Sequence, residues 1–173
     1  YEAISMQALP LFNIVYADKY DTIFYISGGK MPIRNKENGY TWNSTLPGNT
    51  AATRWHEFHP IAKLPQYINP PSGYLFNTNH SPFLATAPKD NLNPENYDKT
   101  SGYELSHNNR SLRFTELMPN DDKLDYEGFK KIKYDGQLPL QLQYAYNLDS
   151  IEMINANDYS DISNIILDYQ QWD

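Results

Sequence analysis

Apolar positions follow a strand-like pattern near the start of the chain. Residues 11–18 (LFNIVYAD) and 22–26 (TIFYI) are rich in β-branched and aromatic side chains, which is typical of strands. The segment between them, residues 19–21, contains a lysine and an aspartate and reads as a turn, and a Gly-Gly pair at 28–29 ends the second strand. The pattern therefore predicts a β-hairpin.

Residues 32–71 predict little regular structure. Pro47-Gly48 is a turn signal, and Trp42 and Trp55 are large apolar side chains in a segment otherwise rich in Asn, Thr and Gly. A loop of this length inside a compact domain is usually functional or packed against a neighbour. Its aromatic content favours packing.

The stretch that follows, residues 64–82 (LPQYINPPSGYLFNTNHSP), is the most informative in the chain. Prolines and a glycine precede an apolar run at residues 74–76, which we expect to form a short strand leading into an amide-rich loop. Asn77 and Asn79 in that loop could hold a small polar or charged group. The alternative is that both are turn residues, because Asn tolerates left-handed backbone and caps its own turn.

The pattern changes to helical periodicity at about residue 103. Apolar residues three and four apart predict four helices. They are expected over 105–118, over 124–132 after a cap at Asp121-Asp122, over 138–148, and over 162–169 after a cap at Asp158 or Ser160. The predicted fold class is α+β, in one unit with a strand-and-loop part, 1–102, and a helical part, 103–173.

Composition excludes several classes of function. The chain has 173 residues, a net charge of −7 and a pI near 5.0, so we expect neither nucleic acid nor an anionic membrane as partner. No apolar run approaches the ~20 residues that a membrane span requires. The absence of cysteine excludes disulfides and thiol nucleophiles, and the histidines at 56, 59, 80 and 107 lack metal-site spacing, so no metal ligand is assigned.

An ordered series of short motifs resembles one known family. The series comprises N-x-x-x-AD at Asn13 to Asp18, P-x-R at Pro32 to Arg34, Pro47-Gly48, Leu64-Pro65, NPPSGY at 69–74, N-x-N-x-SP at 77–82, an arginine-bearing helix near residue 110 and Trp172-Asp173. It is similar to the penicillin acylase family of N-terminal nucleophile hydrolases, which includes acyl-homoserine lactone acylases. One departure is Asp21-Thr22, where the family usually has a glycine.

The resemblance implies a fold and two site residues. The family fold is a four-layer αββα sandwich, of which this chain would form part of the β subunit. Asn79 matches the asparagine whose side-chain amide contributes to the oxyanion hole, and Arg110 matches the arginine that reaches the active site. Arg113 is the alternative match, and the residues alone also allow either arginine to be solvated or paired with Glu116 or Asp121.

The resemblance also implies what lies outside this sequence. The family nucleophile is an N-terminal serine whose own α-amine acts as the base. Position 1 here is Tyr1, so we expect that serine elsewhere in the parent acylase and expect this chain alone to be inactive. The expected partners are the α chain, the rest of the β chain and a small N-acyl substrate, either a penicillin-type amide or an acyl-homoserine lactone. The expected location is periplasmic or secreted.

The family further carries a structural calcium ion. One aspartate ligand would fall between the N-x-N loop and the arginine helix, where Asp90 and Asp98 are candidates. No local cluster offers six oxygens, so calcium is expected only in the intact enzyme and no cofactor in this chain alone.

A rival hypothesis is a non-catalytic binding module. The aromatic loop at 32–71 could bind a carbohydrate or a peptide, because aromatic faces stack on sugars and amides bond to hydroxyls. In that case Trp42 would be the central residue.

Overall fold

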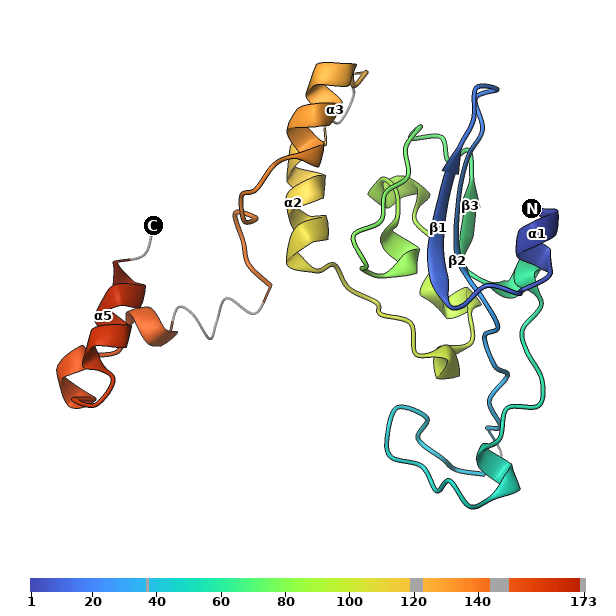
Figure 1. The fold of residues 1–173 in the computed structure, drawn as a ribbon, viewed down its shortest axis with the longest axis horizontal. Helices are drawn as coiled ribbons and strands as arrows, with labels where there is room; N and C mark the ends of the chain where they lie inside the picture. The colour runs from blue at the N-terminus through green and yellow to red at the C-terminus, as the bar shows by residue number, and fades with distance from the viewer. Residues whose placement is uncertain (37, 119–122, 144–149, 172–173) are drawn as a thin grey trace. The chain divides into compact units, whose positions relative to one another are not determined.

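The fold is α+β, a three-stranded antiparallel sheet followed by helices (Figure 1). The computed structural model describes residues 1–36, 38–118, 123–143 and 150–171. These residues cluster into two compact units, Tyr1–Ser111 and Leu112–Asp173, which are described separately. The boundary between the units falls within a helix, and the organisation into one domain stays a prediction.

The first unit contains the predicted hairpin. Strand β1 (Phe12–Ala17) pairs antiparallel with β2 (Ile23–Gly28), with Phe12 opposite Gly28 and Ala17 opposite Ile23. The Asp18 carboxylate holds the turn by accepting hydrogen bonds from the backbone N–H groups of Tyr20, at 2.8 Å, and Thr22, at 3.1 Å. Asp21 adopts a left-handed backbone with φ of 62°, so the turn does not need a glycine.

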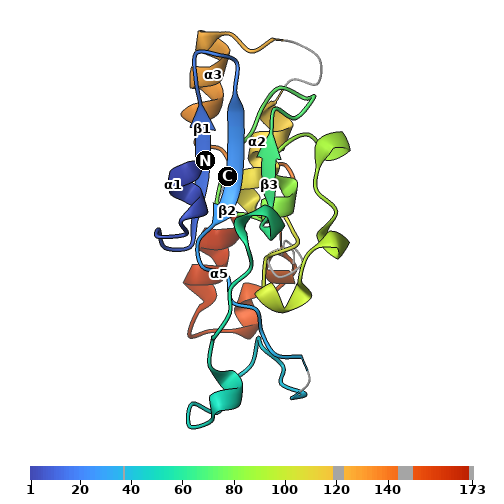
Figure 2. The same ribbon diagram turned by 90° about the vertical axis from the view of Figure 1, so that its right-hand side faces the viewer.

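A third strand completes the sheet on the other side of β2 (Figure 2). Strand β3 (Gln66–Ile68) pairs antiparallel with β2, with Phe24 opposite Ile68. The strand predicted at residues 74–76 is wrong. Residues 74–76 have no regular secondary structure, and Phe76 N–H donates to the carbonyl of Ala85.

The central strand β2 is buried on both faces. Successive side chains of a strand point to opposite faces, so Phe24 and Ile26 enter one apolar cluster, with Met31 and Leu64. Tyr25 enters another cluster that contains Tyr67 and Ala85. A short N-terminal helix, α1 (Glu2–Ser5), adds Ile4 to the first cluster.

Short 3₁₀ turns interrupt the loops of both units. Several of these turns are capped by an Asn, Asp, Ser or Thr side chain that accepts from the backbone two residues later. The turns span Ala51–Thr53, Ile61–Lys63, Pro82–Leu84, Pro88–Asp90, Pro94–Asn96 and Lys99–Ser101 in the first unit, and Ala156–Asp158 in the second. Sparse regular structure at residues 32–71 agrees with the prediction.

Three of the four predicted helices form, and the first two are shorter than predicted. Helix α2 (Asn109–Leu117) begins four residues after Leu105, whose side chain is 66% exposed and outside the helix. Helix α3 (Tyr126–Lys133) is capped by Asp125, whose carboxylate accepts from Gly128 N–H at 2.7 Å. The predicted cap at residues 121–122 lies outside the described residues.

The remaining helix predictions fare differently. Residues 138–143 are not helical, and 144–149 lie outside the described residues. Leu140 donates its backbone N–H to the Glu116 carboxylate at 2.8 Å, which takes it out of any helical hydrogen-bond pattern. Helix α5 (Ser163–Gln170) forms, but its N-cap is Ile162 and not Asp158 or Ser160. Within the described part of the chain, no helix has the length and apolar character needed to cross a membrane.

Truncating the centre of β2 should destabilise the first unit. Ile26 is 0% exposed, so Ile26→Ala should lower the free energy of unfolding by about 2–5 kcal/mol through lost burial and a cavity. Urea unfolding followed by circular dichroism measures this. The control is Val15→Ala on β1, where the side chain is 50% exposed. Equal losses from both variants would contradict the assignment of β2 as the core strand.

Candidate functional site

The structure places Asn79 at the wall of an open hollow in the first unit. The hollow has a volume of about 450 Å³. It is lined by Leu11, Phe12, Asn13, Ser27, Met31, Asn79, Ser101, Gly102 and Tyr103. These residues come from the start of β1, the end of β2 and the loops that contain Met31, Asn79 and residues 101–103, and they combine apolar walls with several polar groups.

The Asn79 side chain is exposed, while its backbone is fixed. Its φ of 55° is left-handed, and its N–H donates to Asn77 Oδ1 at 3.0 Å. Asn77 Oδ1 also accepts from Asn13 Nδ2 on β1, at 3.2 Å. Within the described residues, the side-chain amide of Asn79 has no hydrogen-bond partner. A fixed backbone with an unengaged amide donor is an arrangement that can receive an oxygen atom.

Asn108 joins this loop to the start of helix α2. Its Nδ2 donates to the carbonyl of Thr78 at 3.0 Å and to the carbonyl of Asn79 at 3.1 Å. Its Oδ1 accepts from Ser111 N–H at 2.9 Å and lies 3.3 Å from Thr78 Oγ1. The Asn108 side chain thus caps helix α2 and hydrogen-bonds to the loop at residues 78–79.

His80 supports the same loop from its buried side. The side chain is 4% exposed, its Nε2 lies 2.9 Å from the carbonyl of Leu84, and its Nδ1 accepts from Thr78 N–H at 3.3 Å. This pattern fits the neutral Nε2–H tautomer. Burial lowers the pKa of His80, and the hydrogen bond with the Leu84 carbonyl opposes this as the next largest effect. Smaller effects of His107 and Arg110 lower the pKa, and that of Glu104 raises it.

A stack of rings continues from His80. Its ring lies 4.6 Å from that of Phe76 and 5.7 Å from that of His107, nearly parallel to both. His107 Nδ1 is 3.0 Å from the Oγ of Ser111, which is 0% exposed, and burial lowers the pKa of His107. In this Ser-His pair Ser111 is buried and His107 partly buried, and the pair serves the cap of α2, because Ser111 Oγ also accepts from Asn108 N–H.

Arg110 and Arg113 have different environments. Arg110 is exposed on the first turn of α2, two residues after Asn108, and its charge acts on His80, but it does not line the hollow. In the second unit, Arg113 Nε and Nη2 bind the Asp135 carboxylate at 2.8 and 3.0 Å, and Nη1 binds Glu116 at 3.3 Å. Arg113 is therefore held in a paired position, as one sequence interpretation allowed.

Tyr103 also lines the hollow, and sequence reasoning gave it no role. Its hydroxyl is buried and has no hydrogen-bond partner in the part of the chain that the structure describes. Burial, with a smaller effect of Tyr97, raises the pKa of Tyr103 to about 12. The phenol is therefore protonated at neutral pH. Asn13 and Asn108 are further residues without an assigned role, and no local sequence signal identifies the partners of Asn108.

The calcium candidates are occupied by other contacts. Asp98 accepts from Thr100 N–H and forms an ion pair with Lys36 at 3.0 Å, and its Oδ2 lies 3.4 Å from His59 Nε2. Asp90 accepts from the backbone N–H of Ser72 at 2.7 Å. The described residues contain no group of three or more His, Cys, Asp or Glu side chains able to hold a metal ion.

The Trp42 side chain in the aromatic loop makes several contacts within the chain. The Trp42 Nε1–H donates to the carbonyl of Asn35 at 2.8 Å, and the Arg34 guanidinium lies 5.7 Å from its ring. Tyr40 packs edge-on against the same ring. These contacts engage the side chain that a carbohydrate would need.

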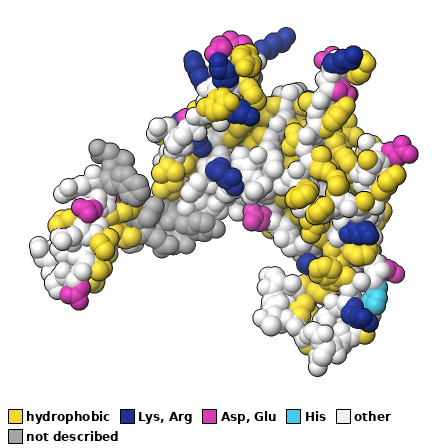
Figure 3. Space-filling view, viewed as in Figure 1, with side chains coloured by type: hydrophobic (Ala, Val, Ile, Leu, Met, Phe, Trp, Pro, Cys, Tyr) yellow, Lys and Arg dark blue, Asp and Glu magenta, His cyan; other side chains and the backbone are white. Residues whose placement is uncertain are grey.

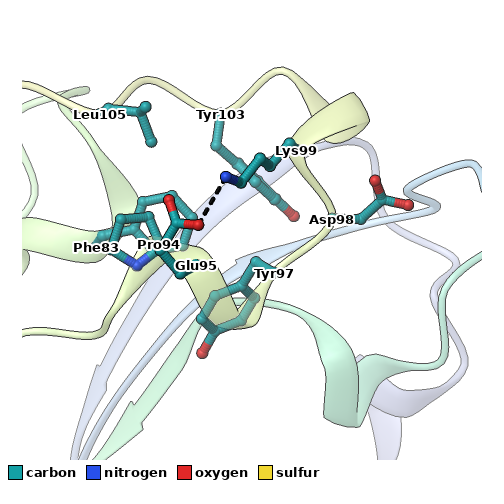
Figure 4. Close-up of a pocket in the computed structure, with 8 residues that line it drawn as sticks. All are labelled: Phe83, Pro94, Glu95, Tyr97, Asp98, Lys99, Tyr103 and Leu105. Carbon is teal, nitrogen blue, oxygen red and sulfur yellow. Dashed lines mark ion pairs between the residues drawn. The ribbon is translucent and has the colours of Figure 1, made fainter.

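A smaller hollow of about 150 Å³ lies beside Tyr103 (Figure 4). Aromatic rings of Phe83 and Tyr97 line it, and the Lys99–Glu95 ion pair, at 2.6 Å, lies along it. In Figure 4 the Asp98 carboxylate points away from that ion pair. Asn79 lines the larger hollow and not this one, so the larger hollow is the stronger candidate for a site.

The penicillin amidase family model matches residues 1–172. The match covers both compact units and every motif discussed above except the final aspartate.

The buried histidines should make the first unit sensitive to mild acid. A folded-state pKa below 6.5 means that, as the pH falls through about 6.5, the unfolded chain binds protons that the folded chain does not. The free energy of unfolding should therefore be greatest above that pH and decline below it. Urea titrations between about pH 7.5 and 5.5 measure the slope.

The matched variants are His80→Gln and His56→Gln. His80→Gln should flatten the pH dependence, because it removes a buried titrating group. His56 is exposed and outside the ring stack, so His56→Gln should leave the slope unchanged. An unchanged slope in His80→Gln would contradict the assigned origin.

Proposed function

The chain belongs to the penicillin amidase family, and on that premise we propose that it supplies the oxyanion-binding part of an amidase that cleaves N-acyl compounds. The substrate class is a penicillin-type amide or an acyl-homoserine lactone. The nucleophilic serine would come from another part of the parent acylase. The chain would then be inactive alone.

The observation that carries the proposal is the state of Asn79. Its backbone is held in a left-handed conformation by neighbouring polar groups, whereas its side-chain amide is exposed beside the hollow. The side chain of an asparagine that only stabilises a turn usually bonds to the backbone of that turn. Here the Asn77 side chain makes that bond, because Asn77 Oδ1 accepts from Asn79 N–H.

The proposed chemistry uses this amide in the transition state. Attack of the serine oxygen on the substrate carbonyl carbon forms a tetrahedral intermediate with negative charge on the former carbonyl oxygen. Asn79 Nδ2 would donate to that oxygen, and one such preorganised donor lowers the barrier by about 3–4 kcal/mol. Collapse expels the amine and leaves an acyl-enzyme, which water then hydrolyses. Arg110 would orient the neighbouring groups as a permanent cation.

Exposed apolar side chains support packing against the rest of a parent acylase. On the sheet of the first unit, Phe12 is 58% exposed, Val15 50% and Ile68 60%, and Figure 3 shows hydrophobic side chains gathered over the hairpin. In the second unit, a separate apolar hollow is lined mainly by isoleucines of α5 and the residues before it. Surfaces of this kind usually mark interfaces. The αββα sandwich is proposed for that larger assembly.

Two further properties are proposals from family membership. One is a periplasmic or secreted location. The other is a structural calcium ion in the intact enzyme, which would need ligands beyond the described residues. No step of the proposed reaction involves calcium.

Removing the Asn79 amide should slow turnover. In the parent enzyme, Asn79→Ala and Asn79→Gly should each lower kcat at least about a hundredfold, because the oxyanion loses its donor. Glycine is the cleaner change, since it accepts a φ of 55°. Steady-state hydrolysis of an N-acyl substrate measures kcat.

Asn69→Gly is the matched control. Asn69 is also left-handed, with φ of 45°, but its side chain is engaged, accepting from Ile23 N–H at 2.8 Å. The Asn69→Gly enzyme should be less stable than the unmodified enzyme and keep its kcat. Full turnover in Asn79→Gly would rule out the oxyanion role.

Substituting Arg110 should affect activity, whereas substituting Arg113 should affect stability. Arg110→Ala should lower kcat/KM by roughly tenfold or more, because an orienting cation is lost. Arg113→Ala should instead lower the melting temperature, since it breaks the contacts to Asp135 and Glu116. Activity and thermal melts on both variants measure this. The reverse outcome would assign the active-site role to Arg113.

A further inference from the structure

We propose that Asn108 is the positioning residue for the oxyanion donor, holding the Thr78–Asn79 backbone so that the Asn79 amide stays at the wall of the hollow. This inference rests on the proposed function, because it assigns Asn108 a role that acts through Asn79. It concerns a side chain whose two ends contact segments about 30 residues apart in the sequence.

The first argument is that both hydrogens of the Asn108 amide are used on consecutive carbonyls. Nδ2 is 3.0 Å from the Thr78 oxygen and 3.1 Å from the Asn79 oxygen. Directing two successive carbonyls at one nitrogen restricts the peptide between them and the torsions on either side of Asn79. That residue occupies the left-handed region, which is sparsely populated outside glycine and relaxes readily if unsupported.

The second argument is that capping does not explain the amide. The helix cap needs only an acceptor, here Oδ1 bonded to Ser111 N–H at 2.9 Å, and serine or aspartate would supply it equally well. The donor end is additional to that requirement, and it is the end that bonds to the loop. An asparagine has two donors and two acceptor positions, and all four have partners here.

The third argument is that Asn108 itself is immobilised. Its N–H donates to Ser111 Oγ at 2.9 Å, and Ser111 Oγ donates back to the Asn108 carbonyl. Ser111 is 0% exposed. A group that positions a catalytic donor must itself be fixed, because a displacement of ~1 Å can cost about a hundredfold in rate.

The test removes the donor and keeps the cap. Asn108→Ser retains one acceptor for Ser111 N–H, and Asn108→Asp retains both acceptor positions, so one of the two remains usable if the other does not fold. The matched control is Asn93→Ser. Asn93 also caps a turn by accepting from a backbone N–H, that of Glu95 at 3.0 Å, and does not contact residues 78–79.

The first measurement is made on this chain by nuclear magnetic resonance. In Asn108→Ser and Asn108→Asp, the Cα and Cβ shifts of Asn79 should lose their left-handed signature, and its N–H should exchange at least about tenfold faster. Asn93→Ser should change neither. Unchanged shifts and exchange in the Asn108 variants would overturn the inference, whatever their activity.

The second measurement is made in the parent enzyme. Both Asn108 variants should lower kcat at least about tenfold with little change in KM, at unchanged melting temperature relative to Asn93→Ser. Adding Asn108→Ser to Asn79→Gly should cause no further loss, because the two act as one unit. A merely structural Asn108 would give additive losses.

The outcomes separate the two proposals. Full turnover in Asn79→Gly overturns the proposed function and this inference with it. Lost turnover in Asn79→Gly with full turnover in Asn108→Ser overturns this inference alone. Additive losses in the double variant also overturn it.

Discussion

The left-handed backbone at Asn79 is the constraint on which the candidate site depends. A non-glycine residue adopts φ of 55° at a cost, and the conformation persists only where surrounding groups impose it. Here Asn77 Oδ1 accepts from the Asn79 N–H, and Asn108 Nδ2 donates to the Asn79 carbonyl. His80 Nδ1 accepts from the N–H of Thr78, the residue before Asn79. The side chain then projects without a partner in the described structure. The local cost is offset by hydrogen bonds that extend into β1 and α2.

The sheet supports the site through polar side chains as well as through its apolar core. Asn13 on β1 donates to Asn77 and thereby fixes the residue that caps the loop. On β3, the Tyr67 hydroxyl donates to the Phe83 carbonyl at 2.8 Å and accepts from Leu92 N–H at 3.1 Å. Burial of Tyr67 beside Tyr25 makes these bonds strong relative to exposed ones. Hydrogen bonds therefore tie the loops that follow β3 to the sheet.

The hairpin is predictable from sequence because its alternation, turn and glycine stop all agree, and the family resemblance supplies Asn79. Strand β3 is not predictable, because three residues carry no measurable period and pair only since β2 offers a second edge. The apolar run at 74–76 misleads because apolar residues also bury in irregular loops. Asn108 is missed for a different reason: its partners lie about 30 residues upstream, and no local rule relates them.

Short polar side chains build most of the loops in this chain, whose mean hydropathy is −0.70. Asp18, Asn77, Asn93 and Asp98 each accept from a backbone N–H two residues later, which fixes a turn without regular structure. In such a chain an exposed asparagine is ordinarily a turn residue. Asn79 can therefore be compared with the turn-capping residues of the same fold. Asn79 has the backbone of a turn residue but not the side-chain bond that the others make. The turn accounts for the backbone conformation of Asn79 but not for its side-chain amide, which makes no bond in the described structure. The proposed oxyanion role gives that amide a function.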